Sequence, residues 1–451
     1  MKLTDLGRQR RIGANCLLAE IGPFRILIDS GLDPKSIGRE STPNFDLLRD
    51  VSLDLVVLTH CHLDHLGSLP IVFRQHPTAM FVSSRASHML AQRMLRNSVN
   101  VMKRQRDETR NNELPLYTFA EVDALDTAMI GLPFNQEKTI ERDGEELTFM
   151  LHRAGHIVGA AGLSIVYKHR RIFFTGDVMF QPQATIEGAD FPIVPTDTLV
   201  METTRGATAR VPEKTRKSEI ERLLTTITHT LERGGSVLIP VFALGRMQEL
   251  LHVLNDAKHR GAIPKCPVFC SGLGMDLVDY FDTIARKIGG LHFRRSILKS
   301  LDVQRPPEFK PGRNPGERGI YLLSSGMMVQ YTPSYQAAAA MLEDHANSIC
   351  FVGYSDPETP GGELLATAHG ENFLFNVLDH SANIRAQIDQ FDLSGHADRQ
   401  ELADFAARLD PRAIALTHGD EEAREWFFDH FIDIDPKRQV YDLLPNETVH
   451  L

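Results

Sequence analysis

Four potential metal ligands within six positions follow one apolar segment, and this combination restricts the fold more than any other feature of the chain. They are His60, His62, Asp64 and His65, and they follow the run 53–58. Such a run is typical of a strand buried on both faces, so we expect the cluster at the strand end and in the loop beyond it. Zinc and similar divalent metals prefer imidazole nitrogen and carboxylate oxygen. Alternate residues His60 and His62 can converge on one ion, while Asp64 and His65 serve another.

Three further candidate ligands stand at the ends of other apolar segments. His156 follows the strand-like segment 147–151, Asp177 closes the segment 171–177, and His418 closes the segment 413–418. A lone residue of this kind more often caps a helix or hydrogen-bonds a loop. The recurrence of an apolar strand, a ligand and a nearby glycine instead indicates one site, because functional residues of α/β proteins gather at one edge of the sheet.

Length and composition are those of an ordinary globular protein. With 451 residues, 42% of them hydrophobic and 24% charged, the chain is expected to form two domains. No apolar run approaches the roughly 20 residues that span a bilayer. The first residues lack an apolar signal core, so we expect a cytoplasmic location and no membrane partner. The five cysteines are irregularly spaced and indicate no disulfide framework.

The net charge of −10 argues against a protein that coats nucleic acid through bulk electrostatics. It does not exclude a nuclease, because the local field of a cleft and its metals outweighs a distant net charge. We expect the basic clusters at 8–11, 103–106 and 294–295 to be solvated faces.

Strand and helix patterns alternate along the whole chain, which indicates an α/β fold. The patterns predict helices over 84–112, 217–233 and 399–408, and buried strands over 236–242, 319–324 and 348–353.

Together, these residues resemble the signatures of the metallo-β-lactamase fold. The segment from His60 to His65 resembles its main motif, Asp29 resembles its first, and His156 and Asp177 resemble its third and fourth. Other segments resemble the β-CASP branch, the nucleic-acid-processing nucleases of that superfamily. They are 201–204 (motif A), 393–398 (motif B), 416–419 (motif C) and 240–249. The resemblance covers nearly the whole chain.

The resemblance implies an α/β architecture in which a Rossmann-like β-CASP domain is inserted into a metallo-β-lactamase αββα sandwich. Residues 1–206 would form the first part of the metallo-β-lactamase domain, 207–368 the insertion, and 369–451 the segment that completes the first domain. The active site would lie in the cleft between the domains.

The same resemblance implies two zinc ions, with manganese as the alternative metal. Family mapping assigns His60, His62 and His156 to one ion, Asp64, His65 and His418 to the other, and Asp177 to both. A metal-bridging hydroxide would be the nucleophile, oriented by Asp64. Asp29 would fix the tautomer of a ligating histidine.

Protonation of the leaving group needs an acid that is not bound to metal. His396 is the candidate, with Glu202 holding its other nitrogen and favouring the imidazolium. The alternative for this segment is a helix N-terminus capped by Ser394 or Asp398. The amides around Ser394 could hold a substrate phosphate. Ser325 is a second candidate phosphate contact, with a simple turn as the alternative.

Substrate choice depends on motif C. In the resembling branch a histidine there marks RNA-processing members and an aliphatic residue marks DNA-repair members, so His418 favours RNA. The chain departs from the branch pattern over 205–210 and at 358–363, where Glu358 and Glu363 are acidic. Both departures concern substrate binding rather than the metal chemistry.

The resemblance therefore predicts a dinuclear zinc-dependent ribonuclease that hydrolyses phosphodiester bonds, with single-stranded RNA as its partner. Endonucleolytic or 5′-exonucleolytic action and a homodimeric assembly stay open. A small-molecule ester or thioester hydrolase of the same fold is an alternative, although that chemistry does not need the Glu202–His396 pair. His418 disfavours a DNA-directed nuclease. The presence of every expected ligand disfavours an inactive scaffold.

Overall fold

The computed structural model describes all residues from Met1 to Leu451, and the chain divides into two compact units. The first unit comprises Met1–Pro182, Glu187–Arg210 and His396–Leu451, and the second comprises Gln183–Ile186 and Val211–Gly395. The second unit is therefore an insertion into the first along the chain.

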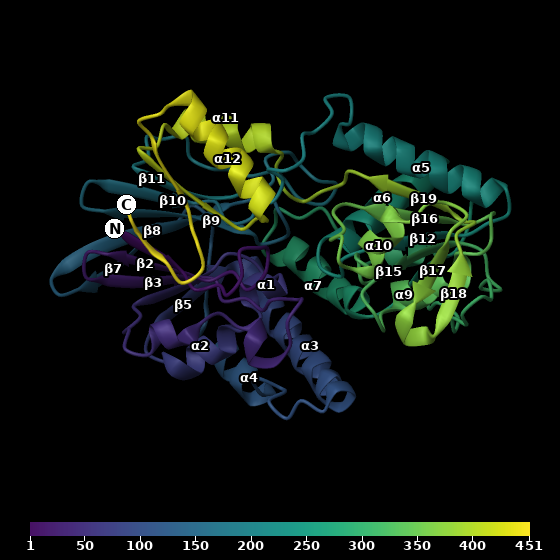
Figure 1. Cartoon of the computed structure of the whole chain (residues 1–451), viewed down its shortest axis with the longest axis horizontal. Coiled ribbons are helices and arrows are strands. Elements are labelled where there is room, and N and C mark those ends of the chain that lie inside the picture. Colours follow the sequence, from purple (N-terminus) through teal and green to yellow (C-terminus); the bar gives the residue numbers. More distant parts are fainter. The chain divides into compact units, whose positions relative to one another are not determined.

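Two seven-stranded sheets form the centre of the first unit (Figure 1). The first has the order β22-β1-β2-β3-β4-β5-β6, with strands at Lys2–Asp5 (β1), Leu17–Ile21 (β2), Phe24–Ile28 (β3), Leu55–Leu58 (β4), Met80–Ser84 (β5), Ile130–Leu132 (β6) and Thr448–His450 (β22). The second has the order β21-β20-β11-β10-β9-β8-β7, with strands at Lys138–Arg142 (β7), Glu145–Arg153 (β8), Ala161–Tyr167 (β9), Arg170–Phe174 (β10), Thr198–Glu202 (β11), Ala413–Thr417 (β20) and Gln439–Asp442 (β21).

The two sheets share one hydrophobic core. Ile26 and Leu55 of the first sheet belong to the same buried cluster as Phe149, Ile165 and Phe174 of the second. All four residues of β4 are buried, as expected for a strand that is covered on both faces. Burial of these side chains is what holds the two sheets together.

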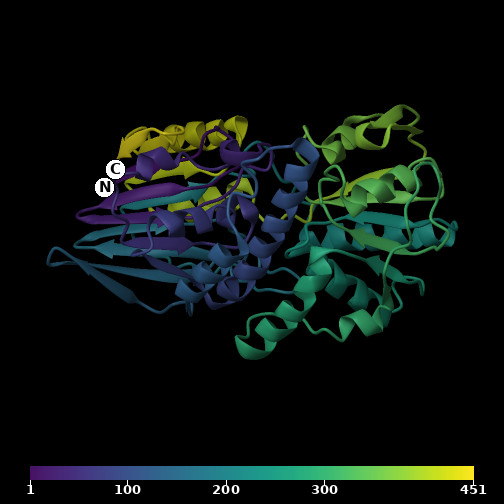
Figure 2. The same cartoon turned by 90° about the horizontal axis from the view of Figure 1, so that it is seen from below.

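Helices cover the outer face of each sheet. They are α1 (Leu63–Leu66), α2 (Leu69–Gln75), α3 (Arg85–Thr109), α4 (Phe119–Ala128), α11 (Arg399–Leu409) and α12 (Glu421–Ile434). The long α3, blue in Figure 2, contacts β5 and β6 of the first sheet. In the second sheet, Leu199 and Met201 of β11 share a second core with Phe405 of α11 and Phe427 of α12. The predicted αββα sandwich is confirmed.

The second unit is a doubly wound parallel sheet of the Rossmann type. Its order is β14-β13-β15-β12-β16-β19, with strands at Val237–Pro240 (β12), Val268–Cys270 (β13), Val303–Gln304 (β14), Ile320–Leu323 (β15), Ser348–Val352 (β16) and Gln387–Phe391 (β19), and every pairing is parallel. A separate hairpin joins β17 (Asn372–Phe375) to β18 (His380–Asn383). The helices are α5 (Arg216–Glu232), α6 (Arg246–His259), α7 (Leu273–Lys287), α8 (Ile297–Ser300), α9 (Pro333–Met341) and α10 (Pro360–Ala366). Figure 1 shows α5 and α9 on opposite sides of this sheet.

Most predicted elements are present with small shifts of their ends. The helices predicted over 84–112, 217–233 and 399–408 are α3, α5 and α11, and the predicted strands are β12, β15 and β16. None of the helices is both long enough and apolar enough to cross a membrane.

The segment 369–395 lies in the second unit, although the sequence analysis assigned it to the segment that completes the first domain. The reason is backbone pairing, because β19 adds to the parallel sheet beside β16 from Ser348↔Gln387 to Val352↔Phe391. The chain returns to the first unit at His396.

Strand direction places the candidate residues at one edge of the sandwich. In the first sheet β3 and β4 are parallel, and in the second β10, β11 and β20 are parallel. Asp29 and His60 follow the carboxyl ends of the first pair. Asp177 and His418 follow the ends of β10 and β20, and Glu202 is the last residue of β11.

Candidate metal centre

The first three histidines predicted to share an ion do converge. His62 Nδ1 lies 3.2 Å from His60 Nε2 and 3.1 Å from His156 Nε2. Ligands at about 2.0–2.1 Å around a tetrahedral zinc ion place their donor atoms about 3.3–3.4 Å apart. These three nitrogens therefore have the spacing of ligands around one ion.

The second predicted set converges in the same way. His65 Nε2 lies 3.2 Å from His418 Nε2, and Asp64 Oδ2 lies 3.4 Å from His418 Nε2 and 3.7 Å from His65 Nε2. His418 adopts a left-handed backbone conformation with φ of 46°, directly after β20. This conformation turns the chain sharply at the strand end.

Asp177 lies beside both sets. Its Oδ2 is 3.6 Å from His60 Nε2, 3.7 Å from His156 Nε2 and 3.4 Å from His65 Nε2. Its Oδ1 is buried and accepts no hydrogen bond, although His418 Nδ1 lies 3.3 Å away. A buried carboxylate oxygen without a hydrogen bond is costly, and a cation would satisfy it. The residues present thus fit divalent cations, with Asp177 beside both ligand sets.

Burial and charge give the histidines different protonation preferences. Burial, reinforced by the imidazole of His65, lowers the pKa of His60 well below its usual value and keeps it neutral. Burial acts in the same direction on His65, but the carboxylates of Asp177 and Asp64 outweigh it and raise the pKa of His65 well above its usual value. Burial raises the pKa of Asp177, but the imidazoles of His418 and His65 outweigh it and hold that pKa well below its usual value. The carboxylates therefore stay ionised, as metal ligands must.

Asp29 binds the segment between β4 and α1, and α1 carries Asp64 and His65 of the second set. Its Oδ2 lies 2.7 Å from His65 Nδ1, which leaves Nε2 of that ring facing His418. Thr59 donates its backbone N–H to Asp29 Oδ1 and its hydroxyl to Asp29 Oδ2, both at 2.7 Å. Asn15 Nδ2 also donates to Asp29 Oδ2, at 3.4 Å. The geometry supports the predicted role of Asp29 in fixing the tautomer of a ligating histidine.

His396 and Glu202 form a pair beside the two sets. His396 Nδ1 lies 2.9 Å from Glu202 Oε2, and Glu202 is 1% exposed. The backbone N–H of Val178 donates to Glu202 Oε1 at 2.6 Å. Burial lowers the pKa of His396, but Glu202 outweighs it and raises that pKa above its usual value. The ring centroid of His396 is 4.4 Å from that of His156, so the pair borders the first set.

The two predicted phosphate contacts, Ser394 and Ser325, belong to the second unit and bind other residues of that unit. The carbonyl of Ser394 accepts from Arg216 Nη1 at 2.8 Å, and Ser325 Oγ accepts from the backbone N–H of Val329 at 2.9 Å. Asp398, rather than Ser394, caps α11, because its side chain accepts from the N–H groups of residues 400 and 401. Substrate contact by either serine stays a prediction.

The structure adds three residues that the sequence analysis missed. Asn15 contacts both Asp29 and His65, Thr59 binds Asp29, and Thr204 Oγ1 lies 3.0 Å from His418 Nδ1. Thr59 stands directly before His60, and Thr204 is the last residue of motif A, so their positions offered a signal. Asn15 offered none, because it lies in a loop 14 residues before Asp29 in the chain.

Cys61 is not part of the donor set. Its thiol donates to the carbonyl of Ser87 at 3.1 Å, and burial raises its pKa to about 12. Its side chain therefore turns toward α3, away from the neighbouring histidines, as the alternation of a strand end predicts.

Family models match three consecutive parts of the chain. Residues 10–223 match the metallo-beta-lactamase superfamily, 247–364 match the Beta-Casp domain, and 381–438 match the Zn-dependent metallo-hydrolase RNA specificity domain. The transcription termination factor FttA of Pyrococcus abyssi is 30% identical over 455 residues, which cover 94% of this chain and 67% of that protein. The chain belongs to the β-CASP branch of the metallo-β-lactamase superfamily.

Other relatives agree with this placement of the β-CASP protein. Cleavage and polyadenylation specificity factor 73 of Drosophila melanogaster is 26% identical, across 93% of this chain and 60% of that protein. Probable RNase MJ4 of Methanocaldococcus jannaschii is 26% identical, across 97% and 98% of the two chains. A crystal structure of a protein of unknown function from Enterococcus faecalis superposes with a TM-score of 0.56 at 14% identity, covering 100% and 99% of the chains, and supports the fold alone.

Replacing Asp177 should remove more metal than replacing any other single ligand, because its carboxylate lies beside both sets. We expect Asp177→Asn to fall from about two metal ions per chain to below one, by the ligand preferences of these ions. Elemental analysis of the purified variant measures this. Asp50→Asn, which changes an exposed carboxylate of the same unit, serves as the control and should keep full occupancy. Full occupancy in Asp177→Asn would contradict the bridging position.

Gly31→Ala should disturb the second ligand set through the backbone. A Cβ at residue 31 would lie 1.6 Å from the carbonyl oxygen of Asp64, so the short helix α1, which carries Asp64 and His65, must move. We expect a loss of stability of about 1–3 kcal/mol and a lower metal content. Gly316→Ala, where an added Cβ meets nothing within 4 Å, is the control and should change neither. Chemical denaturation and elemental analysis of both variants measure the effect, and unchanged values in Gly31→Ala would contradict it.

Proposed function

We propose that this β-CASP protein is a dinuclear zinc-dependent ribonuclease that hydrolyses phosphodiester bonds in single-stranded RNA. The observation that carries the proposal is the convergence of two ligand sets on Asp177 beside the Glu202–His396 pair. Manganese is the alternative metal, because the same nitrogen and oxygen donors accept it.

Two divalent ions bound to these residues would lower the pKa of a shared water and stabilise charge on the attacking and leaving oxygens of a displacement at phosphorus. His60, His62 and His156 would hold one ion, and Asp64, His65 and His418 the other, with Asp177 between them. The carboxylate of Asp64, 22% exposed, would also orient the attacking water by accepting its proton.

His396 is suited to protonate the leaving oxygen. Glu202 accepts from its Nδ1 and stabilises the imidazolium, so the other ring nitrogen keeps a proton to donate. The His396 side chain is 18% exposed, so it can reach solvent and substrate. Its ring nitrogen also lies within 4.8 Å of donor atoms of His156 and Asp177, so a role as a metal ligand is the competing assignment.

The relatives support RNA as the substrate. The match of residues 381–438 to an RNA specificity domain, and the overall similarity to a probable RNase, both favour RNA over DNA. His418 at motif C agrees with this choice. The Glu202–His396 pair counts against a small-molecule ester or thioester hydrolase, because hydrolysis of an activated ester needs no separate acid for its leaving group.

The acidic departure at Glu363 has a local explanation that does not involve substrate. Glu363 is exposed in the first turn of α10, where a negative charge stabilises the positive end of the helix dipole. Thr359 caps this helix by accepting from the N–H of Gly362. This departure therefore does not count against RNA.

One assay tests the proposal directly. Purified protein with measured metal content is given single-stranded RNA labelled at the 5′ or the 3′ end, matched DNA, and a thioester. We expect cleavage of RNA that is lost on chelation and restored by zinc or manganese. Faster cleavage of DNA or of the thioester would overturn the proposal, and the two labels distinguish endonucleolytic from exonucleolytic action.

His396→Ala should keep its metals and lose most RNA cleavage. Loss of a general acid costs on the order of 10²–10⁴ in rate. His345→Ala, which removes a histidine that is 91% exposed, serves as the control and should keep both activity and metal. A loss of metal together with activity in His396→Ala would make His396 a ligand rather than the acid.

Glu202→Gln should shift the pH dependence of cleavage. A general acid works only while protonated, so activity falls as pH rises through its pKa. Glu202 raises the pKa of His396 while burial lowers it, so removing the carboxylate charge lowers this pKa. We therefore expect the alkaline limb of the kcat profile to move to lower pH in Glu202→Gln. If the alkaline limb stayed at the same pH in Glu202→Gln, it would report the titration of a group other than His396.

A further inference from the structure

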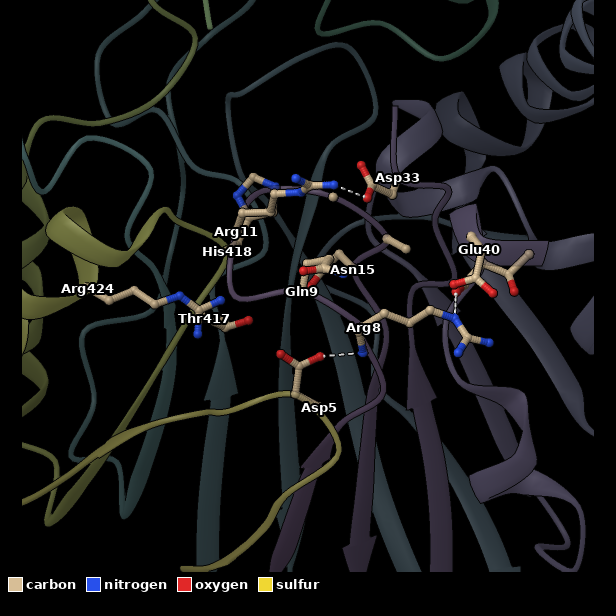
Figure 3. A pocket seen from close by; sticks show the side chains of 14 residues that line it. Asp5, Arg8, Gln9, Arg11, Asn15, Asp33, Glu40, Thr417, His418 and Arg424 are labelled. Atoms are coloured by element: carbon tan, nitrogen blue, oxygen red, sulfur yellow. Dashed lines mark hydrogen bonds and ion pairs between the residues drawn. The ribbon is translucent and has the colours of Figure 1, made fainter. Parts of the chain in front are cut away.

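A polar pocket in the first unit opens beside the metal centre. Figure 3 shows it between the loop that follows β1, the segment around Asp33 and Glu40, and the end of β20. Asn15 and His418 line this pocket and also contact the second ligand set. The pocket therefore lies next to the place where we expect a phosphodiester to be cleaved.

Most arginines around this pocket are neutralised by carboxylates. Arg11 Nη2 donates to Asp33 Oδ2 at 2.7 Å. Arg424 is 2% exposed and donates to the carbonyls of Gly419 and Leu443, both at 2.8 Å, and to Asp442 at 3.2 Å. These two side chains stabilise the loop and α12.

The neighbouring Arg10 is held in the same way, because its guanidinium donates to both Glu421 and Asp442. The basic run that the sequence analysis expected to be a solvated face is thus largely structural, and Arg8 is the member that differs.

Arg8 is exposed and forms no ion pair. Its Nε donates to the carbonyl of Thr42 at 2.9 Å, which fixes the direction of the guanidinium, and its two terminal nitrogens remain available. Figure 3 shows this side chain on the wall of the pocket. A guanidinium with two parallel N–H donors matches the geometry of a phosphate group.

The acidic side chains of the pocket do not neutralise the positive charge of Arg8. Asp33 is paired with Arg11, and Asp5 is buried and accepts from the N–H of Gly7 at 2.7 Å. Glu40 is exposed and is the remaining carboxylate that faces the pocket. On a chain with a net charge of −10, an unpaired arginine beside the metal centre provides local attraction for a polyanion.

We propose that this pocket binds a backbone phosphate of the RNA strand, near the cleaved bond, and that Arg8 is its principal contact. The inference rests on the proposed function, because it assumes that a nucleic acid strand passes the metal centre. Arg8 would fix the position of the strand without reading its sequence, as phosphate contacts do. Glu40, at the same wall, would keep additional phosphates out of the pocket by charge repulsion.

The test measures equilibrium binding of labelled single-stranded RNA at several salt concentrations, in a His396→Ala background that limits cleavage. Adding Arg8→Ala should weaken binding roughly tenfold or more at low salt, since a hydrogen-bonded charge contact is lost. The slope of log affinity against log salt should become shallower by roughly 0.7, the value for one phosphate contact on a single strand. Arg8→Lys should restore the slope and part of the affinity. Matched DNA should lose affinity by the same factor, because its phosphates are identical.

Arg49→Ala is the matched control. Arg49 is an arginine of the same unit whose side chain is 74% exposed, and it precedes β4 at the edge of the sheet opposite to the metal centre. It should bind RNA with unchanged affinity and slope. Metal content and Tm of every variant are measured alongside, so that a folding defect is recognised.

The outcomes separate the two proposals. If the wild-type protein cleaves RNA but Arg8→Ala binds it with the original affinity and slope, the pocket inference is wrong and the proposed function stands. If the wild-type protein cleaves no RNA, the proposed function fails first. An effect of Arg8→Ala on RNA alone, with DNA binding unchanged, would assign the pocket to a ribose hydroxyl and would also overturn the phosphate assignment.

Discussion

The packing of two sheets against one apolar core is the constraint on which the metal centre depends. Ile26 and Leu55 on one side and Phe149 and Phe174 on the other pack together and hold the two sheets against each other. Because the parallel strands of both sheets end at the same edge, ligands that are far apart in sequence arrive in one small volume. The chemistry therefore depends on side chains that never contact substrate.

Charged groups in that volume are costly to bury. His60, His65 and Asp29 are 0% exposed, and Asp177 is 3% exposed. Ionised groups at such depth are stable only when they are paired or bound to a cation. Asp29 satisfies this condition through donors from the protein itself, whereas Asp177 retains an oxygen that accepts no hydrogen bond. The contrast separates a carboxylate that supports a ligand from one that is suited to be a ligand.

Much of this arrangement could be predicted from the sequence, and the limits have physical causes. Apolar runs that end in histidine or aspartate indicated both the strands and the donor set, because burial and ligand chemistry each have a local signature. The assignment of β19 to the sheet of the second unit lacked such a signature. Its place beside β16 depends on backbone pairing between distant segments, which composition does not reveal. Asn15 and the free guanidinium of Arg8 also lay beyond prediction. Their roles follow from which neighbours compete for them in three dimensions, and a basic run does not reveal which of its members is neutralised.

The two ligand sets differ in how far apart their members lie along the chain. His62 meets His156 across 94 positions, whereas His65 meets His418 across 353 positions, with the whole second unit in between along the chain. Contacts of such separation form late, since the entropy of closing a long loop must be overcome before they contribute. Strand β20, which lies between β11 and β21, must be in place before the second set is complete. During synthesis the chain would thus complete the first ligand set well before the second, and a nascent or unfinished chain would hold a half-built site.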